Sequence, residues 1–297
     1  MKTKLDLTIS IVSYNTRDYL RQCLNSIFEN TRGVSFELIV VDNASTDGSA
    51  EMVAEEFSSV TLICNEENRY FAVAHNQALK LARGEFFLIL NSDTVVPSET
   101  ISKLATFLED NKQAGAVTCR EVDGSQRAVI TSTRFPSVPA TIAEWTALRN
   151  WPLRKVFDRY MMSHWQRDTA RTIEVASGCF IMGRTELLRK FGGFDERIKL
   201  YYSEHDLCRQ ISRAGFTIHF RPEAHYVHFG QRSSCQQSLL AIRKIHFADM
   251  RYYFAKYHGR VAATAMLSII RLLRFVSRVA SRISLRLASA RRETAAT

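Results

Sequence analysis

Four apolar runs, each followed by a segment with helical spacing, fill the first 110 residues and constrain the fold more than any other feature. The apolar runs are 7–12, 36–41, 60–64 and 85–90, and the helical segments after them are 16–29, 45–57, 71–82 and 97–108. Parallel strands need crossover helices and are buried on both faces. The alternation therefore predicts an α/β fold with a doubly wound, mostly parallel sheet and flanking helices.

The rest of the chain has a less regular pattern. A fifth strand is expected at 116–119, and further elements are a strand at 178–182, a helix from 184, a helix at 203–214, strands at 216–220 and 224–228, and helix beyond 230. Periodicity is lost between 123 and 171, where prolines and tryptophans cluster. We expect a first domain over 1–232, with 125–171 as a lid or substrate-facing insertion, and a helical C-terminal extension over 233–297.

The net charge of +10 is concentrated in the C-terminal tail. Nine basic residues and one acidic residue lie in 256–297, which leaves only +2 for the remaining 255 residues. A nucleic-acid-binding protein more often spreads positive charge over a face of its folded part. We therefore expect no nucleic-acid partner.

The tail has the pattern of a basic amphipathic helix over 262–292. Arginines at 271, 274, 278, 282 and 286 follow a spacing of three and four residues, with apolar residues between them. Such a helix lies in the interface of an anionic bilayer, and its arginines are too frequent for a transmembrane span. The alternative is a helix packed on the core or on a partner with its arginines in water.

Cysteine spacing and the N-terminus indicate a reducing compartment. The six cysteines are scattered, with no spacing typical of a disulfide framework or a zinc ribbon. Asp6 interrupts the N-terminal apolar run, and no small-residue cleavage site follows it. We expect a cytoplasmic protein without a secretory signal.

Polar residues follow the predicted strands at 13–15, 42–43, 65 and 91–93. Ligands of open α/β sheets bind beyond the carboxyl ends of the strands, so these residues are candidates for a binding site. Asp93 follows a buried strand, where a carboxylate can hold a divalent cation that neutralises a diphosphate. The alternative role for Asp93 is a helix cap or an Asx turn.

Two further groups are candidates for chemistry. Glu204 and Asp206 lie where a helix begins, and either carboxylate could act as a general base or merely complement the helix dipole. His219, His225 and His228 lie on or beside two short strands, where a histidine is a metal ligand or a packed residue. The glycine-rich motifs of P-loop ATPases and dinucleotide dehydrogenases and the Gly-x-Ser-x-Gly motif of serine hydrolases are absent from the sequence.

Five motifs in chain order resemble glycosyltransferase family 2, whose members are inverting enzymes with the GT-A fold. They are Thr-Ile-Ser-Ile-Val-Ser-Tyr-Asn at 8–15, Leu-Ile-Val-Val-Asp-Asn-Ala-Ser-Thr-Asp-Gly-Ser at 38–49, the segment 65–76, Ala-Arg-Gly-Glu-Phe-Phe-Leu-Ile-Leu-Asn-Ser-Asp-Thr-Val-Val-Pro at 82–97, and Gly-Gly-Phe-Asp-Glu at 192–196. The likeness covers roughly residues 7 to 232. Asn-Ser-Asp-Thr-Val-Val-Pro at 91–97 and Arg-Phe-Pro-Ser at 134–137 resemble the bacterial rhamnosyltransferase-like members.

The resemblance implies roles for individual residues. Donor binding falls to Ser13, Asn15, Asp42, Asn43, Asn68, Asn76, Asn91 and Ser92, and binding of Mn2+ or Mg2+ falls to Asp93 and His228. Glu204 corresponds to the usual base, with Asp206 in reserve. Two departures weaken the match: Asn91 stands where the Asp-x-Asp motif begins, and Ser203-Glu204 stands in place of the family's Glu-Asp pair.

The function implied by the resemblance is that of a metal-dependent inverting hexosyltransferase. It would move a sugar, with a rhamnose-like deoxyhexose favoured, from a TDP- or UDP-linked donor to a hydroxyl of a glycan or lipid-linked acceptor in bacterial surface polysaccharide synthesis. The basic helix would hold it peripherally on the inner face of the cell membrane. One alternative is a catalytically inactive homologue that binds nucleotide-sugar or acts as a scaffold. A nucleotidyltransferase is less favoured, because the N-terminal region lacks a glycine- and arginine-rich pyrophosphorylase loop.

Overall fold

The computed structural model describes residues 5–230 and 238–295, and within the last helix it describes side chains as far as residue 279. The strands are β1 (Leu7–Ser13), β2 (Phe36–Asp42), β3 (Thr61–Cys64), β4 (Phe86–Asn91), β5 (Thr94–Val95), β6 (Ala114–Val122), β7 (Arg171–Ile173), β8 (Phe180–Arg184) and β9 (Thr217–His228). The helices are α1 (Arg17–Asn30), α2 (Ser49–Glu56), α3 (Tyr70–Leu81), α4 (Thr100–Asp110), α5 (Val138–Trp145), the short 3-10 helix η1 (Ala147–Arg149), α6 (Arg154–Met161), α7 (Thr185–Lys190), α8 (Ser203–Arg213), α9 (Leu239–His258) and α10 (Arg260–Ala295).

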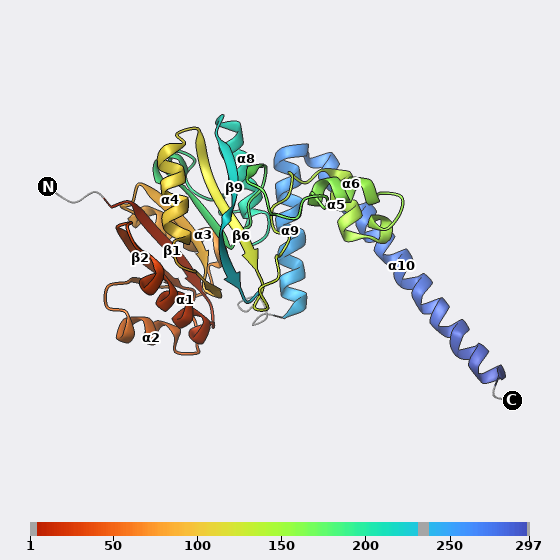
Figure 1. The fold of residues 1–297 in the computed structure, drawn as a ribbon. Helices are drawn as coiled ribbons and strands as arrows, with labels where there is room; N and C mark the ends of the chain where they lie inside the picture. The colour runs from red at the N-terminus through yellow and green to blue at the C-terminus, as the bar shows by residue number, and fades with distance from the viewer. Residues whose placement is uncertain (1–4, 231–237, 296–297) are drawn as a thin grey trace. The chain divides into compact units, whose positions relative to one another are not determined.

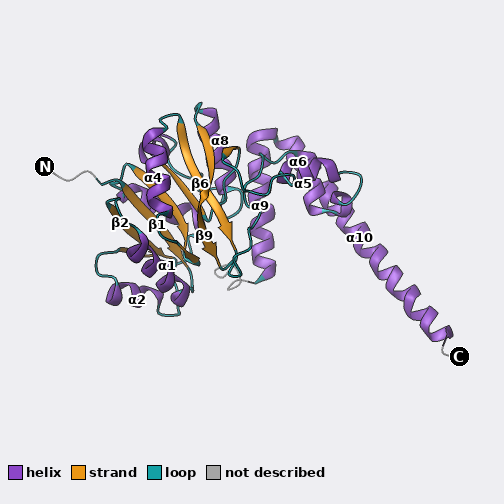
Figure 2. Cartoon of the chain, in the orientation of Figure 1, coloured by secondary structure: helices purple, strands orange, loops and turns teal. Residues whose placement is uncertain are grey.

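The strands form one mixed sheet in the order β3-β2-β1-β4-β8-β6-β9-β5, with β7 on β9 (Figure 2). The pairs β2/β3, β1/β2, β1/β4 and β6/β9 are parallel. β8 is antiparallel to both β4 and β6, so β6 and β9 run in the same direction as β1 to β4. The mostly parallel sheet predicted from the sequence is confirmed, and its six co-directional strands bring their carboxyl ends to the same edge.

The side chains on both faces of β1 are buried, which is typical of a strand inside a parallel sheet. Leu7, Ile9 and Ile11 are fully buried and pack with α1, α2 and α4 in one apolar cluster. Successive side chains of a strand point to opposite faces, so Thr8 and Ser10 face the other way. There the Oγ of Ser10 lies 2.8 Å from Nδ1 of His75 on α3, and the helices therefore cover both faces of the sheet (Figure 1).

A glycine at position 84 allows β4 to begin beside β1. A Cβ atom on Gly84 would lie 2.3 Å from the backbone carbon of Leu7 and 2.3 Å from the backbone nitrogen of Thr8. Real Cβ atoms do not approach backbone atoms this closely, so any larger residue would push the two central strands apart.

Two expectations for the second half of the chain are corrected by the structure. The strands expected at 216–220 and 224–228 are one strand, β9, whose pairing with β6 shifts between Cys119 and Arg120. Proline has no N–H to donate to a ladder, so Pro222 produced the apparent break in the sequence pattern. The stretch 125–171, expected to be irregular, contains α5, η1 and α6.

The chain divides into two compact units. The first comprises 1–135 and 165–250, and the second comprises 136–164 and 251–297. The boundary expected between 232 and 233 lies outside the described residues, and the expected lid is divided, because 136–164 group with the C-terminal helices. Within the second unit α5 packs against both α6 and α10. Among the described helices, none has both the length and the apolar character needed to cross a membrane.

Candidate active site

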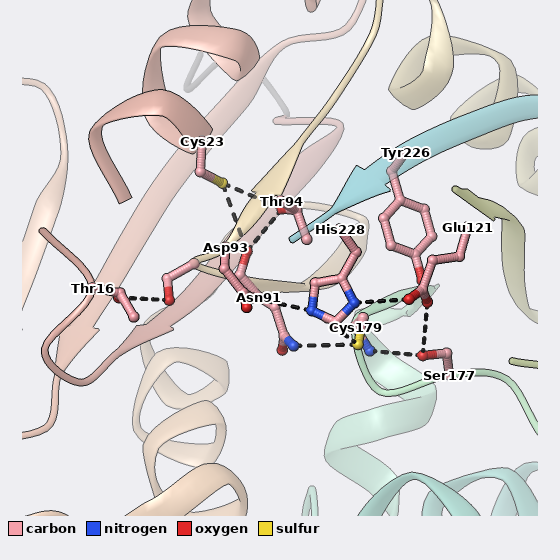
Figure 3. A network of polar contacts seen from close by, with 11 residues as sticks. Thr16, Cys23, Asn91, Asp93, Thr94, Glu121, Ser177, Cys179, Tyr226 and His228 are labelled. Atoms are coloured by element: carbon pink, nitrogen blue, oxygen red, sulfur yellow. Dashed lines mark hydrogen bonds and ion pairs between the residues drawn. The ribbon is translucent and has the colours of Figure 1, made fainter. Parts of the chain in front are cut away.

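The carboxyl-end edge of the sheet collects polar side chains from strands that are distant in sequence. β1 ends at Ser13, β2 at Asp42, β4 at Asn91 and β9 at His228. These are the positions expected for ligand binding on an open α/β sheet. The closest grouping lies where the turn after β4 meets the end of β9 (Figure 3).

Asp93 is held rigidly in the turn between β4 and β5 and is 3% exposed. The Oγ1 of Thr94 donates a 2.8 Å hydrogen bond to the carbonyl of Asn91, and the Sγ of Cys23 lies 3.5 Å from that Oγ1. The carbonyl of Asp93 accepts a hydrogen bond from the N–H of Phe229, which follows β9 directly. Because α4 begins only at Thr100, Asp93 does not cap that helix.

His228 lies between two carboxylates. Its Nε2 is 3.1 Å from Oδ1 of Asp93, and its Nδ1 is 2.8 Å from Oε1 of Glu121 on β6 (Figure 3). The hydroxyl of Tyr226 donates a 2.5 Å hydrogen bond to Oε2 of Glu121. Tyr226 is fully buried and Glu121 is 5% exposed, so this group is fixed from behind by the sheet itself.

Cys179, just before β8, completes this cluster. Its Sγ lies 3.8 Å from Nε2 of His228 and accepts a 3.2 Å hydrogen bond from Nδ2 of Asn91. Burial raises the pKa of the Cys179 thiol, although the neighbouring His228 opposes that shift. Burial lowers the pKa of His228, but its hydrogen bonds with Asp93, Cys179 and Glu121 outweigh burial and raise the pKa to about 12. Without a bound cation, His228 is therefore protonated and lies as an imidazolium between the two carboxylates.

The donor set of this cluster fits a divalent cation. Glu121, Cys179 and His228 each offer a ligand atom, and these atoms lie within 4.8 Å of one another. Asp93 adds a carboxylate oxygen on the Nε2 side of the ring. Carboxylate and imidazole ligands suit Mn2+, and a cation with two positive charges can replace the proton that His228 otherwise carries.

Asp42 presents an unused acceptor at the end of β2. Its Oδ2 accepts a 2.8 Å hydrogen bond from the N–H of Ser45, whereas its buried Oδ1 has no hydrogen-bond partner among the described residues. Burial raises the pKa of this carboxyl. A buried acceptor without a partner costs stability, which is typical of a group kept for a ligand.

Three other predicted donor-binding residues organise the loops at this edge. The Oδ1 of Asn15 accepts a 2.7 Å hydrogen bond from the N–H of Thr46. The hydroxyl of Thr16 lies 3.1 Å from that of Ser13 and 2.8 Å from that of Ser92. These contacts tie the end of β1 to the turn that carries Asp93.

Asn43, Asn68 and Asn76 are also engaged within the protein. The Nδ2 of Asn43 donates to the carbonyl of Tyr70, and Oδ1 of Asn68 accepts from the N–H of Tyr70 at 2.9 Å. Asn76 is buried on α3 and binds both the N–H and the carbonyl of Phe194, at 2.8 and 2.9 Å. Their contact with a donor stays a prediction.

A second glycine explains how the segment with Phe194 reaches Asn76. Gly193 has a φ of +78°, and a Cβ there would lie 2.2 Å from Oδ1 of Asn76. Only glycine combines this backbone conformation with so close an approach. The Gly-Gly motif at 192–193 therefore allows this segment to pack closely against α3.

The two candidate bases differ in environment. Glu204 lies in the first turn of α8 with its side chain 21% exposed, and its Oε1 is 3.1 Å from Nδ1 of His205. Glu204 also lies beside the segment just before β8, because a Cβ on Gly178, next to Cys179, would lie 3.8 Å from the Cδ of Glu204. Asp206 is 1% exposed, and its Oδ2 accepts a hydrogen bond from Gln210. Of the two, Glu204 is the more accessible carboxylate.

Sequence reasoning missed Glu121, Tyr226, Cys179 and Thr16. Glu121 stands near the end of a strand before a polar turn, a place where an acidic residue is ordinarily solvated, and its partners are 105 and 107 residues away. A usable signal was present in β9: Tyr226 and His228 are two residues apart and point to the same face.

The chain is similar to known glycosyltransferases over most of its length. Residues 8–192 match the family described as Glycosyl transferase family 2. The chain is 25% identical over 289 residues to the uncharacterized glycosyltransferase YfnE of Bacillus subtilis, covering 85% of this chain and 70% of that protein. It is 23% identical over 233 residues to the rhamnosyltransferase WbbL of Escherichia coli, covering 76% of this chain and 84% of that protein.

The fold also resembles solved glycosyltransferases. The mannosyltransferase PcManGT from Pyrobaculum calidifontis, in complex with GDP-Man and Mn2+, superposes with a TM-score of 0.54 at 20% identity. The alignment covers 96% of this chain and 81% of that one. The sheet is therefore that of a GT-A glycosyltransferase, and the chain belongs to glycosyltransferase family 2.

Proposed function

We propose that this glycosyltransferase moves a sugar, with inversion, from a nucleoside-diphosphate sugar to a hydroxyl of a glycan or lipid-linked acceptor in bacterial surface polysaccharide synthesis. The favoured donor is a TDP- or UDP-linked deoxyhexose of the rhamnose type. Support for this donor comes from the motifs at 91–97 and 134–137 and from the similarity to a rhamnosyltransferase.

The observation that carries the proposal is the meeting of Asp93 and His228. The two residues are 135 positions apart, yet their side-chain atoms are 3.1 Å apart at the edge where α/β sheets bind ligands. The open Oδ1 of Asp42 at the same edge supports nucleotide binding, because it can accept a hydrogen bond from a base or a ribose.

Asp93 and His228 would hold Mn2+ or Mg2+, and the bound cation supplies positive charge that stabilises a diphosphate leaving group. The buried turn around Asp93 and the pair formed by Glu121 and Tyr226 fix both side chains before any ligand arrives. The protein therefore contributes preorganisation, because little reorganisation is needed when the donor binds.

Glu204 is the proposed general base. Its carboxylate would accept the proton of the acceptor hydroxyl while that oxygen bonds to the anomeric carbon and the carbon–diphosphate bond breaks. Attack from the face opposite the diphosphate inverts the anomeric carbon. The partial exposure of Glu204, against the burial of Asp206, supports this choice.

Turnover tests the reaction and separates the two carboxylates. Purified protein, manganese, a lipid-linked acceptor and a panel of TDP-, UDP- and GDP-sugars should release nucleoside diphosphate with one of the donors. Glu204→Gln should lower turnover by about two orders of magnitude or more and leave donor affinity unchanged. Loss of turnover in Asp206→Asn at normal stability, with Glu204→Gln active, would identify the other base. Donor binding without turnover on any acceptor would favour the inactive homologue.

We further propose that α10 attaches the protein to the cytoplasmic face of an anionic membrane, where a lipid-linked acceptor would be found. One side of α10 packs within the protein, because Met266 and Ile270 on that side are fully buried. On another stripe the apolar residues Val261, Ile269, Leu272, Phe275, Val276 and Val279 are between 39% and 84% exposed. Arg271 and Arg278 are exposed beside them. An apolar stripe next to arginines fits the interface of an anionic bilayer.

Co-sedimentation with vesicles tests this attachment. The protein should sediment with vesicles that contain anionic phospholipid. At high salt it should dissociate from them, because salt screens the attraction between its arginines and the lipid headgroups. Phe275→Glu should weaken binding about tenfold or more, whereas Phe275→Leu keeps the stripe apolar and should bind nearly as well. Equal binding of both variants would contradict insertion of this stripe.

A further inference from the structure

The two nitrogens of the His228 ring face different partners. Nε2 faces Oδ1 of Asp93 at 3.1 Å and Sγ of Cys179 at 3.8 Å, whereas Nδ1 faces Oε1 of Glu121 at 2.8 Å. A cation bound at Nε2 therefore meets one oxygen and one sulfur donor from the protein. Glu121 lies behind the ring, on the side away from Asp93.

Glu121 fixes the ring in the form that a cation needs. A hydrogen bond from Nδ1–H to the Glu121 carboxylate leaves Nε2 facing Asp93 and Cys179, where a cation can take the place of the Nε2 proton. Such carboxylate partners behind a ligating histidine commonly set its tautomer and its basicity. The 2.5 Å hydrogen bond from Tyr226 keeps the carboxylate in place.

Cys179 is held in position by backbone contacts that do not depend on the cluster. Its carbonyl accepts a 3.1 Å hydrogen bond from the N–H of Asn91. The next residue, Phe180, pairs with Leu90 in the ladder between β8 and β4. The sulfur is thus placed by two central strands, and the 3.2 Å hydrogen bond from Nδ2 of Asn91 stabilises a thiolate there.

We propose that Cys179 is a third protein ligand beside Asp93 and His228, so that the site takes a transition-metal dication in preference to Mg2+. This inference rests on the proposed cation site. Thiolate sulfur binds first-row transition metals far better than it binds magnesium, which prefers oxygen ligands in an octahedral arrangement. Asp93 and a Cys179 thiolate together balance the two charges of the ion. When the ion binds, the thiol proton of Cys179 and the Nε2 proton of the His228 imidazolium both pass to solvent.

Cobalt spectroscopy on the full-length protein tests the ligand directly. The protein is titrated with Co2+ without oxygen, and a thiolate ligand gives an intense sulfur-to-cobalt charge-transfer band in the near ultraviolet. The band should appear in the wild type and in Cys64→Ser, which removes an exposed thiol elsewhere. It should vanish in Cys179→Ser, or in Cys179→Ala if the serine variant folds poorly, while the visible cobalt bands remain.

Calorimetry measures the metal selectivity of the site. Cys179→Ser should weaken Co2+ and Zn2+ binding at least tenfold and leave Mg2+ binding within about twofold, whereas a purely structural role for Cys179 would change all three alike. Co2+ binding without the charge-transfer band would overturn the sulfur ligand but leave the proposed function intact. If Asp93→Ala and His228→Ala bind Co2+ as the wild type does, the proposed cation site itself fails.

Discussion

Replacing Asn76 with alanine should destabilise the protein, because the Asn76 side chain holds a segment that is distant in sequence. The Asn76 amide binds the N–H and the carbonyl of Phe194, and its Nδ2 also lies 3.0 Å from Oε1 of Glu196. Asn76 and Phe194 are 5% and 6% exposed, so water cannot readily replace the lost partner. The variant therefore leaves two buried backbone groups unsatisfied.

The magnitude follows from those groups. Each buried, unsatisfied backbone group costs about 1 to 3 kcal/mol, so Asn76→Ala should lower the free energy of unfolding by about 4 kcal/mol. For a chain of this size, that loss corresponds to a fall in Tm of about 6 °C. Gln77→Ala is the matched control. Among the described residues, the Gln77 side chain hydrogen-bonds the side chain of Asn65 and no backbone group, so the substitution should cost about 1 kcal/mol.

Urea unfolding followed by tryptophan fluorescence measures the stability, and calorimetry with nucleoside diphosphate at low temperature measures binding by the folded fraction. A wild-type unfolding midpoint for Asn76→Ala, combined with lost nucleotide affinity, would refute the reasoning. That result would leave Asn76 only the donor-contact role that the family resemblance implies.

Three further outcomes are expected. Burial lowers the pKa of His75 to about 3, below its ordinary 6.5. Between these values the unfolded chain binds more protons, so stability is lost as pH falls below 6.5, by about 2 kcal/mol at pH 5. Urea unfolding at pH 7 and pH 5 should show this loss, and His75→Asn should lack the His75 part of it. Gly84→Ala should lower the free energy of unfolding by about 3 kcal/mol or more in the same assay, since the added Cβ would overlap the backbone of Leu7. A decrease of less than about 1 kcal/mol would contradict the close approach. Asp42→Asn should weaken nucleoside diphosphate binding about tenfold in calorimetry without loss of stability, and unchanged affinity would exclude Asp42 from the binding site.

The sequence predicted the first half of the fold well, because its strands carry their own signal. β4 and most of β2 are continuous apolar runs, and β1 places small hydroxyl residues between apolar ones; such strands suit a parallel sheet that is buried on both faces. The insertion of β8 between β4 and β6 had no local signal. Strand order depends on packing between distant segments, which a pattern read over neighbouring residues does not contain.

The position of the candidate site could be predicted in outline for a similar reason, whereas the roles of its residues stay predictions. Asp93 follows a recognisable buried strand, so its position at the sheet edge could be inferred, and His228 came from the family resemblance. Glu121 and Cys179 become site residues only through contacts with His228, which is 107 and 49 residues away. No spacing along the chain marks such pairs, because β6, β8 and β9 meet only in the folded sheet.

Asp93 and His228 are proposed to form a cation site that binds a nucleoside diphosphate. Calorimetric titration of UDP, TDP and GDP with manganese, and again with chelator, tests it most directly. One nucleotide should bind only with the cation, and Asp93→Ala should remove this dependence and most of the affinity. Equal, manganese-dependent affinity in Asp93→Ala and the wild type would contradict it.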